Sequence, residues 1–298
     1  MSNRLLAPAA LPFMILCALA GCAPRERQQP DTGAATAPPQ APLILTATDY
    51  AFQFPDTVAA GWVTVRLVNH GNVPHMAQLI RLDSAHTVEQ YHQAYTEAFR
   101  TRGPRPEWAR RLGGPTVTVP HDSSSATLFL EPGTYVWNCL YNVPDGIPHA
   151  VGHGMTGSFV VAGREEMGAT RTAPTADVVI RLADYSFSLN PPLTAGRHVI
   201  KVENAGPEPH EVGLIRLAPG KTMQDFFAWL EKPGNTPPDS IGTVTGGTTS
   251  LAPGAEVWFE ADLTPGEYLL LCFVTSPDGR SHIEQGMAQQ ITVPAAAQ

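Results

Sequence analysis

The feature that most constrains the fold is an internal repeat, because the two halves of the 298-residue chain carry the same motifs in the same order. Residues 69–82 (NHGNVPHMAQLIRL) return 135 residues later as 204–217 (NAGPEPHEVGLIRL). The motif Pro-Gly-x-Tyr at 132–135 returns 133 residues later, at 265–268. Self-similarity over such a period indicates an architecture of repeated structural units. Each unit spans about 115–120 residues, which is an ordinary size for one domain.

The repeat sets the expected domain boundaries. We expect one domain over residues 43–162, a short polar linker over 163–176 and a second domain over 177–294. Segments such as 62–68 and 198–202 alternate large apolar residues with polar or smaller ones, which is typical of half-buried strands. Together, 26 glycines and 29 prolines supply too many turns for a helical bundle. The sequence therefore predicts an all-β chain of two tandem β-sandwiches.

One short helix is expected to interrupt the strands of each unit. In the first unit, Thr87 suits an N-cap and precedes an aromatic and aliphatic stripe at helical spacing, formed by Val88, Tyr91, Tyr95 and Phe99. In the second unit, Thr222 suits the N-cap of a helix that ends before Pro233-Gly234. That helix carries Phe226, Phe227, Trp229 and Leu230. We interpret both stripes as faces that dock on the sandwich rather than as a cofactor site.

The N-terminus has the features of a bacterial targeting segment. Residues 1–21 contain one charge, Arg4, and a short apolar run over 11–20 that suits the core of a signal peptide. They end in Leu-Ala-Gly before Cys22, which resembles the lipobox of bacterial lipoproteins, and this resemblance implies that Cys22 is lipidated. Residues 22–42 are rich in Pro, Ala, Gln and Thr and are predicted to be a disordered tether. The alternative is ordinary secretion with an incidental cysteine.

Charge and anchor together define the expected partners and location. The net charge is −8, which removes the electrostatic attraction that supports binding to nucleic acids. We therefore expect no nucleic-acid partner and contact with the membrane only through the lipid on Cys22. The expected location is extracytoplasmic, and in a Gram-negative cell the lipobox resemblance favours the periplasmic face of the outer membrane.

Both units contain the same set of metal-binding residue types in the same order. Each has a His after a Pro and before a strand, and then a Cys, a second His and a Met within one short stretch. Two imidazoles, one thiolate and one weak axial thioether are the donors of a type 1 copper site. The sequence therefore predicts up to two type 1 copper ions per chain.

These motifs resemble the cupredoxin family, and plastocyanin-like domains in particular. The segment 265–272 (PGEYLLLC) is similar to the family's Gly-x-Tyr-x-x-x-Cys strand, and 282–293 (HIEQGMAQQITV) is similar to its ligand loop and closing strand. The resemblance implies two tandem Greek-key sandwiches and two copper sites. The implied ligands are His75, Cys139, His149 and Met155 in the first unit and His210, Cys272, His282 and Met287 in the second. It also implies that electrons pass through a solvent-near edge of His149 or His282.

Three alternatives to this ligand assignment stay open at the level of sequence. His153 competes with His149 as the second imidazole, although His149 shares the Pro-Asp-Gly-x-x-His context with His282. Cys139 and Cys272 could instead form one disulfide. A third alternative is that the domains keep the cupredoxin shape without metal, since a fold does not fix a function.

The sequence favours a carrier over an enzyme. Multicopper oxidases and copper nitrite reductases place a histidine next to the blue-site cysteine and add His-x-His pairs, and neither feature is present here. We expect one-electron transfer with a redox protein as partner. The alternatives are a metal-free binding or scaffolding lipoprotein and a protein for copper storage or delivery.

Overall fold

The structure of the chain is a computed structural model. It describes residues 41–142, 146–163, 173–231 and 241–295. The predicted signal peptide over 1–21, the predicted lipidation site Cys22, nearly all of the predicted tether and most of the predicted linker lie outside the described residues, as does Pro233-Gly234.

The first half of the described chain is dominated by short strands. In chain order its elements are β1 (Leu43–Thr48), β2 (Ala51–Gln53), β3 (Thr57–Ala59), β4 (Gly61–Asn69), β5 (Gln78–Leu82), α1 (Val88–Thr101), β6 (Ala109–Arg111), β7 (Ser123–Leu130), β8 (Gly133–Asn138), α2 (His149–Gly152) and β9 (Thr156–Ala162).

The second half repeats most of this order. Its elements are β10 (Val178–Ala183), β11 (Ser186–Asn190), β12 (Gly196–Asn204), β13 (His210–Leu217), α3 (Met223–Leu230), β14 (Gly242–Leu251), β15 (Glu256–Leu263), β16 (Gly266–Leu271) and β17 (Ala288–Val293).

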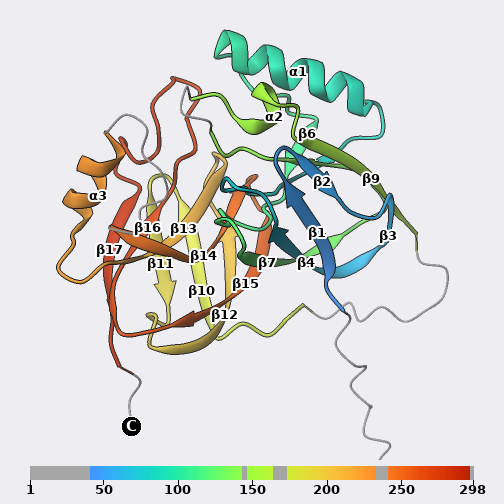
Figure 1. Ribbon diagram of the computed structural model, residues 1–298. Helices are drawn as coiled ribbons and strands as arrows, with labels where there is room; N and C mark the ends of the chain where they lie inside the picture. Colours follow the sequence, from blue (N-terminus) through green and yellow to red (C-terminus); the bar gives the residue numbers. More distant parts are fainter. Residues whose placement is uncertain (1–40, 143–145, 164–172, 232–240, 296–298) are drawn as a thin grey trace, which may run out of the picture. The chain divides into compact units, whose positions relative to one another are not determined.

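The strands form three sheets, and one of them runs through both halves. Its order is β11-β10-β12-β15-β7-β4-β1-β2, with the two halves joined where Trp258 of β15 pairs with Thr127 of β7 (Figure 1). The first half adds a sheet of order β3-β9-β8-β5-β6, and the second adds one of order β14-β13-β16-β17. The prediction of an all-β chain of tandem sandwiches is therefore confirmed.

Strand alternation explains how each sandwich forms its core. Along β4, residues at every second position are buried, as the sequence pattern predicts for a half-buried strand. Tyr135 and Tyr268 are fully buried in equivalent strands, and their hydroxyls donate to the carbonyls of Glu131 at 2.8 Å and Thr264 at 2.9 Å. These tyrosines fix the turn that leads into the strand before each cysteine.

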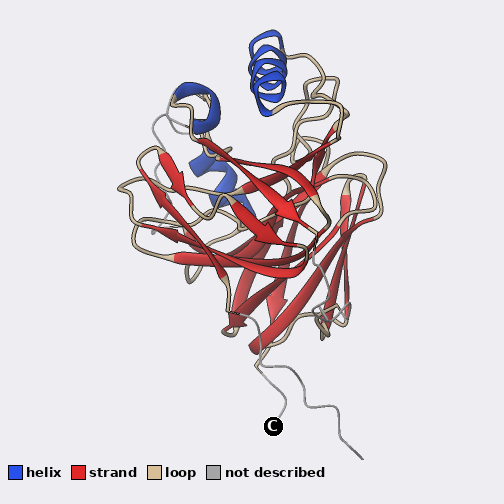
Figure 2. Ribbon diagram, turned by 90° about the vertical axis from the view of Figure 1, so that its right-hand side faces the viewer, coloured by secondary structure: helices blue, strands red, loops and turns tan. Residues whose placement is uncertain are grey.

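Both expected helices are present and dock as predicted. The Thr87 hydroxyl accepts from the backbone N–H of Gln90, and Thr222 makes the same cap with Asp225. Tyr91 on α1 packs with the buried residues Ile80, Leu82 and Val136, and Phe226 on α3 packs in an equivalent cluster of the second half. The helices lie outside the layers of strands (Figure 2). Within the described residues, none of the helices has the length and apolar character needed to cross a bilayer.

Candidate metal centres

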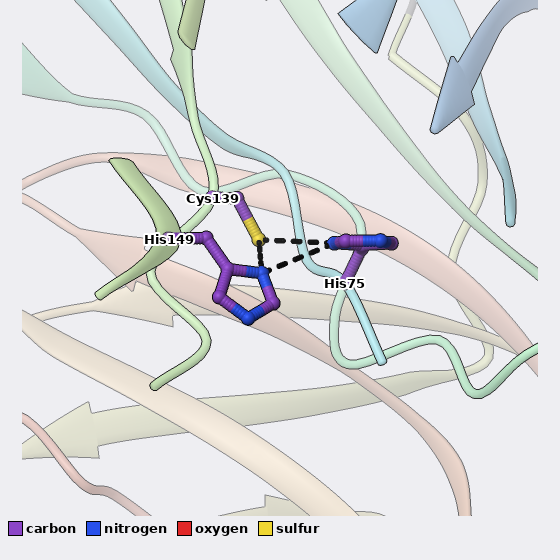
Figure 3. Close-up of side chains that lie close together, drawn as sticks. All are labelled: His75, Cys139 and His149. Carbon is purple, nitrogen blue, oxygen red and sulfur yellow. Dashed lines mark hydrogen bonds between the residues drawn. The ribbon is translucent and has the colours of Figure 1, made fainter. Parts of the chain in front are cut away.

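The first candidate centre is formed by His75, Cys139 and His149, which come from separate parts of the first half. His75 precedes β5, Cys139 follows β8 directly, and His149 begins the four-residue helix α2. Their side chains turn toward one point, with both Nδ1 atoms and the Sγ atom facing one another (Figure 3). All three residues are buried, with at most 1 % of their surface exposed.

The three donor atoms of this centre form a nearly equilateral triangle. Sγ of Cys139 lies 3.7 Å from His75 Nδ1 and 3.5 Å from His149 Nδ1, and the two nitrogens are 3.2 Å apart. A point equidistant from the three atoms lies about 2.0 Å from each of them, close to the ~2.0–2.3 Å at which nitrogen and sulfur ligands bind a zinc ion. The triangle therefore has the size of a metal site.

A repeated asparagine shapes the loop that delivers the first histidine of each centre. The Asn69 side chain donates to the carbonyls of Val73 at 2.8 Å and Thr118 at 3.0 Å and accepts from the N–H of Gly71 at 2.8 Å. Asn204 makes the equivalent bonds in the second half. These bonds satisfy buried backbone groups in an irregular loop, and they hold the following Pro-His in place.

The second centre repeats the first with His210, Cys272 and His282. His210 opens β13, Cys272 follows β16, and His282 lies in the loop before β17. Nδ1 of His282 is 3.3 Å from Cys272 Sγ and 2.9 Å from His210 Nδ1. All three residues are completely buried. The spatial convergence implied by the repeated motifs therefore occurs in both halves.

Acidic side chains bind the outer nitrogen of three of the four histidines. Nε2 of His75 lies 3.2 Å from Asp49 Oδ1, and Nε2 of His210 lies 2.5 Å from Asp184 Oδ1. Nε2 of His282 lies 3.1 Å from Glu208 Oε2. Because a carboxylate only accepts, it places the imidazole proton on Nε2 and leaves a lone pair on Nδ1. Such partners are the usual support of metal-binding histidines.

With the proton on Nε2, the Nδ1 atoms of the histidines are free to bind a metal ion. In the second centre, both Nδ1 atoms would carry lone pairs while lying 2.9 Å apart. Two acceptors cannot hydrogen-bond to each other, so a cation between them resolves the contact. The cluster combines a soft sulfur, which favours Cu(I), with imidazole nitrogens, which also suit copper. The residues of both centres therefore fit type 1 copper.

The methionines lie beside the clusters in equivalent backbone positions. Met155 and Met287 are completely buried. The N–H of Met155 donates to the His149 carbonyl at 3.1 Å, and its carbonyl accepts from the N–H of Cys139 at 3.1 Å. Met287 makes the same two bonds with His282 and Cys272, at 2.8 and 3.2 Å. The extra residue before Met155 is thus absorbed within the loop, and both methionines stay proposed axial ligands.

Burial controls the charge of the donors. Loss of solvation raises the pKa of the Cys139 thiol to about 12 and raises that of Cys272 further still. Loss of solvation, together with the charge of nearby His75, lowers the pKa of His149 to about 4. Each sulfur also accepts a backbone N–H, from Met76 at 3.5 Å and from Glu211 at 3.4 Å. At neutral pH the metal-free centres therefore contain thiols rather than thiolates.

The structure decides two of the alternatives left by the sequence. His153 is exposed and stacks on Tyr50 with a centroid distance of 3.7 Å, so it is His149 that joins the cluster. Cys139 and Cys272 are both free, so the alternative of a disulfide is wrong.

The expectation of a solvent-near histidine edge is also wrong. His149 is 1 % exposed and His282 is fully buried. Tyr50 lies edge-on over His149 at 4.8 Å, and Tyr185 lies edge-on over His282 at 4.9 Å. Both tyrosines belong to the repeated Asp-Tyr-x-Phe motif, which also supplies Asp49 and Asp184. The repetition of this motif in the two halves was the available sequence signal for a role at the site.

Several solved structures resemble this chain in part. No protein-family model and no curated protein matches the chain. Among solved structures, reduced auracyanin from Roseiflexus castenholzii is 22 % identical, with a TM-score of 0.28, over 40 % of this chain and 94 % of that one. Auracyanin A, a "blue" copper protein from Chloroflexus aurantiacus, is 20 % identical, with a TM-score of 0.28, over 41 % and 100 %. A blue copper oxidase from Nitrosomonas europaea is 15 % identical, with a TM-score of 0.23, over 84 % and 76 %.

Because these identities and TM-scores are low, the fold and the candidate metal sites are assigned from the chain's own strands and side chains. Each half is a β-sandwich with a His, Cys and His cluster at equivalent places in the strand order. The chain therefore has a tandem cupredoxin-like fold with two candidate type 1 copper sites. Within the part of the chain that the structure describes, these are the two clusters of metal-binding side chains.

Proposed function

We propose that the chain is an envelope lipoprotein that binds copper at both centres and transfers single electrons. The observation that carries the proposal is the convergence of two imidazole nitrogens and one sulfur in each half, in the same arrangement. His75, Cys139 and His149 would hold one ion and His210, Cys272 and His282 the other, with Met155 and Met287 as axial ligands. Copper, when bound, supplies a one-electron couple between Cu(II) and Cu(I).

The surrounding protein supports electron transfer more than copper delivery. All of the proposed ligand side chains are buried, and three imidazoles are fixed by carboxylates. Releasing the metal would require these hydrogen bonds and the covering tyrosines to open, whereas an electron can pass with the ligands in place. Preorganised ligands also keep the donor geometry the same in both oxidation states, which lowers the reorganisation needed for transfer.

Copper titration of the reduced, metal-free protein tests the proposal. We expect two equivalents of Cu(II) to bind and to produce an intense visible absorption from thiolate-to-copper charge transfer. Cys139→Ser and Cys272→Ser should each remove one equivalent and its share of the absorption. His153→Ala is the matched control, because His153 lies outside the cluster, and it should retain both equivalents. A folded protein that binds no copper, or that binds it without the visible band, would contradict the proposal and favour a metal-free scaffold.

Copper retention distinguishes electron transfer from delivery. We expect fast electron self-exchange in the loaded protein and slow loss of copper to a competing chelator. Rapid loss of copper with sluggish self-exchange would favour storage or delivery.

The proposed location has its own test. The full-length chain should fractionate with membranes through a lipid on Cys22, and Cys22→Ala should move it to the soluble fraction. Cys17→Ala, in the proposed signal core, is the control and should leave fractionation unchanged. If the Cys22→Ala chain stayed with the membrane, the anchor would be wrong while the copper proposal would stand.

A further inference from the structure

Glu208 is a carboxylate that contacts His282 of the second centre and has no acidic counterpart in the first half. Oε2 of Glu208 accepts from Nε2 of His282 at 3.1 Å and from Oγ of Ser276 at 2.7 Å, and Oε1 accepts from the Tyr185 hydroxyl at 3.2 Å. Nε2 of Gln285 in turn donates to Ser276 at 2.7 Å. Three donors therefore hold the carboxylate in one orientation against the imidazole, one from the turn between β10 and β11 and two from the loop between β16 and β17.

The equivalent position in the first half carries no charge. The repeat aligns Glu208 with Val73, and the structure confirms that the two backbones correspond. Asn69 Nδ2 donates to the Val73 carbonyl at 2.8 Å, and Asn204 Nδ2 donates to the Glu208 carbonyl at 2.7 Å. The same backbone site thus carries an apolar side chain in the first half and an acidic one in the second.

The contacts of the tyrosine that covers the second histidine also differ between the two halves. In the first half, Tyr50 stacks on the exposed ring of His153. In the second half, the corresponding Tyr185 directs its hydroxyl to Glu208 and Ser276. His149 therefore lies under an aromatic stack, whereas His282 lies under a hydrogen-bonded acidic network.

A carboxylate on the outer nitrogen changes what the inner nitrogen offers to a metal. It holds the proton on Nε2, increases the electron density of Nδ1 and adds a negative charge close to the site. All three effects stabilise Cu(II) more than Cu(I), because the electrostatic attraction scales with the charge of the ion. The centre with the additional carboxylate should therefore be harder to reduce.

We propose that Glu208 is a positioning residue that makes the two centres inequivalent, by orienting His282 and lowering the reduction potential of the second centre below that of the first. This inference rests on the proposed copper function. An electron entering the loaded chain would then reside on the first centre, and the second would be reduced after it.

Redox titration of the copper-loaded chain tests this order. Native protein should show two one-electron steps, and the lower one should persist in Cys139→Ser and disappear in Cys272→Ser. In the Cys139→Ser background, Glu208→Val should weaken Cu(II) binding by about 10–100-fold, as loss of such a support does elsewhere. With Cu(I) binding unchanged, the potential of the second centre rises by about 59 mV for each tenfold loss. Glu208→Gln, which is nearly isosteric, should give a smaller rise.

Two further measurements separate this role from a general effect on folding or charge. Glu284→Gln removes the same charge from a carboxylate that accepts from Ser281 rather than from an imidazole, and it should leave the potential nearly unchanged. In the Zn(II)-loaded protein, the Nε2–H proton of His282 should be protected from exchange in native protein and exposed in Glu208→Val.

The possible results separate the proposed role of Glu208 from the proposed copper function. If native protein binds two copper ions with visible bands, but Glu208→Val and Glu208→Gln leave the second potential unchanged or lower it, the inference is wrong and the copper function stands. A higher potential at the second centre than at the first in native protein would also overturn it. Failure to bind copper at all would instead overturn the proposed function.

Discussion

The two cysteines are thiols in a setting that disfavours their ionised form. Burial is the main cause of the raised pKa at both residues, and at Cys272 the nearby charge of Glu211 adds to it. Burial also raises the pKa of Glu211 to about 7. The N–H that Phe273 donates to this carboxylate at 3.0 Å lowers the pKa, but by less than burial raises it. A metal ion must therefore displace a proton from each sulfur, which links metal binding to pH.

Copper binding at neutral pH should release protons. Because the pKa of Cys139 is about 12 and that of His149 is about 4, the first centre holds one proton on sulfur and none on His149 at pH 7. We expect about one proton released per copper bound, and an apparent affinity that rises about tenfold per pH unit for each centre between pH 7 and 9. Calorimetry in buffers of different ionisation enthalpy measures the number directly. Binding without proton release would mean that the sulfurs are already ionised or do not bind.

The metal-free protein should lose stability as the pH falls. The pKa of His149 lies near 4 in the folded chain, below its ordinary value of 6.5, so the unfolded chain binds the proton more readily. The stabilising contribution is present above pH 6.5 and is lost as the pH falls toward 4, by an amount on the order of 2–3 kcal/mol. Urea unfolding of native protein and His149→Gln at several pH values measures it. A similar slope in both proteins would contradict the assignment to His149.

At the scale of single elements, the loop that carries the first histidine of each half has little free space. A Cβ atom added at Gly206 would lie 2.5 Å from Asp184 Oδ1 and 2.9 Å from His210 Nε2. Real side chains do not approach so closely, so the glycine allows the aspartate to reach the imidazole. The repeated Asn-x-Gly segment is therefore a structural part of the site.

Gly206→Ala should disturb the second centre alone. We expect it to push Asp184 from His210 and to weaken copper binding at that centre by about 10–100-fold, in line with loss of a carboxylate support. Gly213→Ala is the matched control, because the added atom would meet only the Leu271 carbonyl at an ordinary 3.9 Å. Separate titrations in the Cys139→Ser background measure the effect, and equal affinity in the two variants would show that the close approach is unimportant.

Local signals made some of these elements predictable. The caps at Thr87 and Thr222 and the aromatic faces behind them depend on residues within one or two turns, so sequence spacing is sufficient to find α1 and α3. The short helix α2 was not predicted, because four residues give no periodic signal. The His, Cys and His cluster of each half was predictable because the same residue types occur twice in the same order.

The cover of the site was not predictable, because it depends on contacts between distant segments. Asp49 and His75 are 26 residues apart, as are Asp184 and His210, and only the folded strands bring them together. The sequence suggested that an imidazole edge reaches solvent, whereas Tyr50 and Glu208 close over those edges from other loops. A spacing pattern identifies donors, but it does not show what packs on their far side.

Across the whole molecule, the two halves share buried polar contacts. Nε2 of Gln78 in the first half donates to the carbonyl of Ser250 in the second at 2.9 Å and to that of Gly113 at 3.3 Å. Gly113 N–H donates to the same Ser250 carbonyl at 3.0 Å, and Thr248 Oγ1 donates to the Gly114 carbonyl at 3.1 Å. Buried bonds of this kind couple the stability of the halves, since breaking them leaves polar groups without partners.

Gln78→Leu should weaken this coupling. We expect a loss of about 1–3 kcal/mol in the free energy of unfolding, because buried carbonyls lose a donor. Unfolding should also separate into two steps, since each half then loses the other's support. Urea unfolding followed by tryptophan fluorescence and by circular dichroism measures both effects. Gln93→Leu, an exposed change on α1, is the control, and a single unshifted transition in Gln78→Leu would contradict the coupling.

The pairing of β7 with β15 also bears on solubility. Each of these strands would be the edge of a four-stranded sheet if its half stood alone, and an open edge can recruit a strand from another molecule. In the intact chain the two edges meet at Thr127 and Trp258. Tandem duplication therefore protects against aggregation, because each half covers the open strand edge of the other and leaves it unavailable to a second chain.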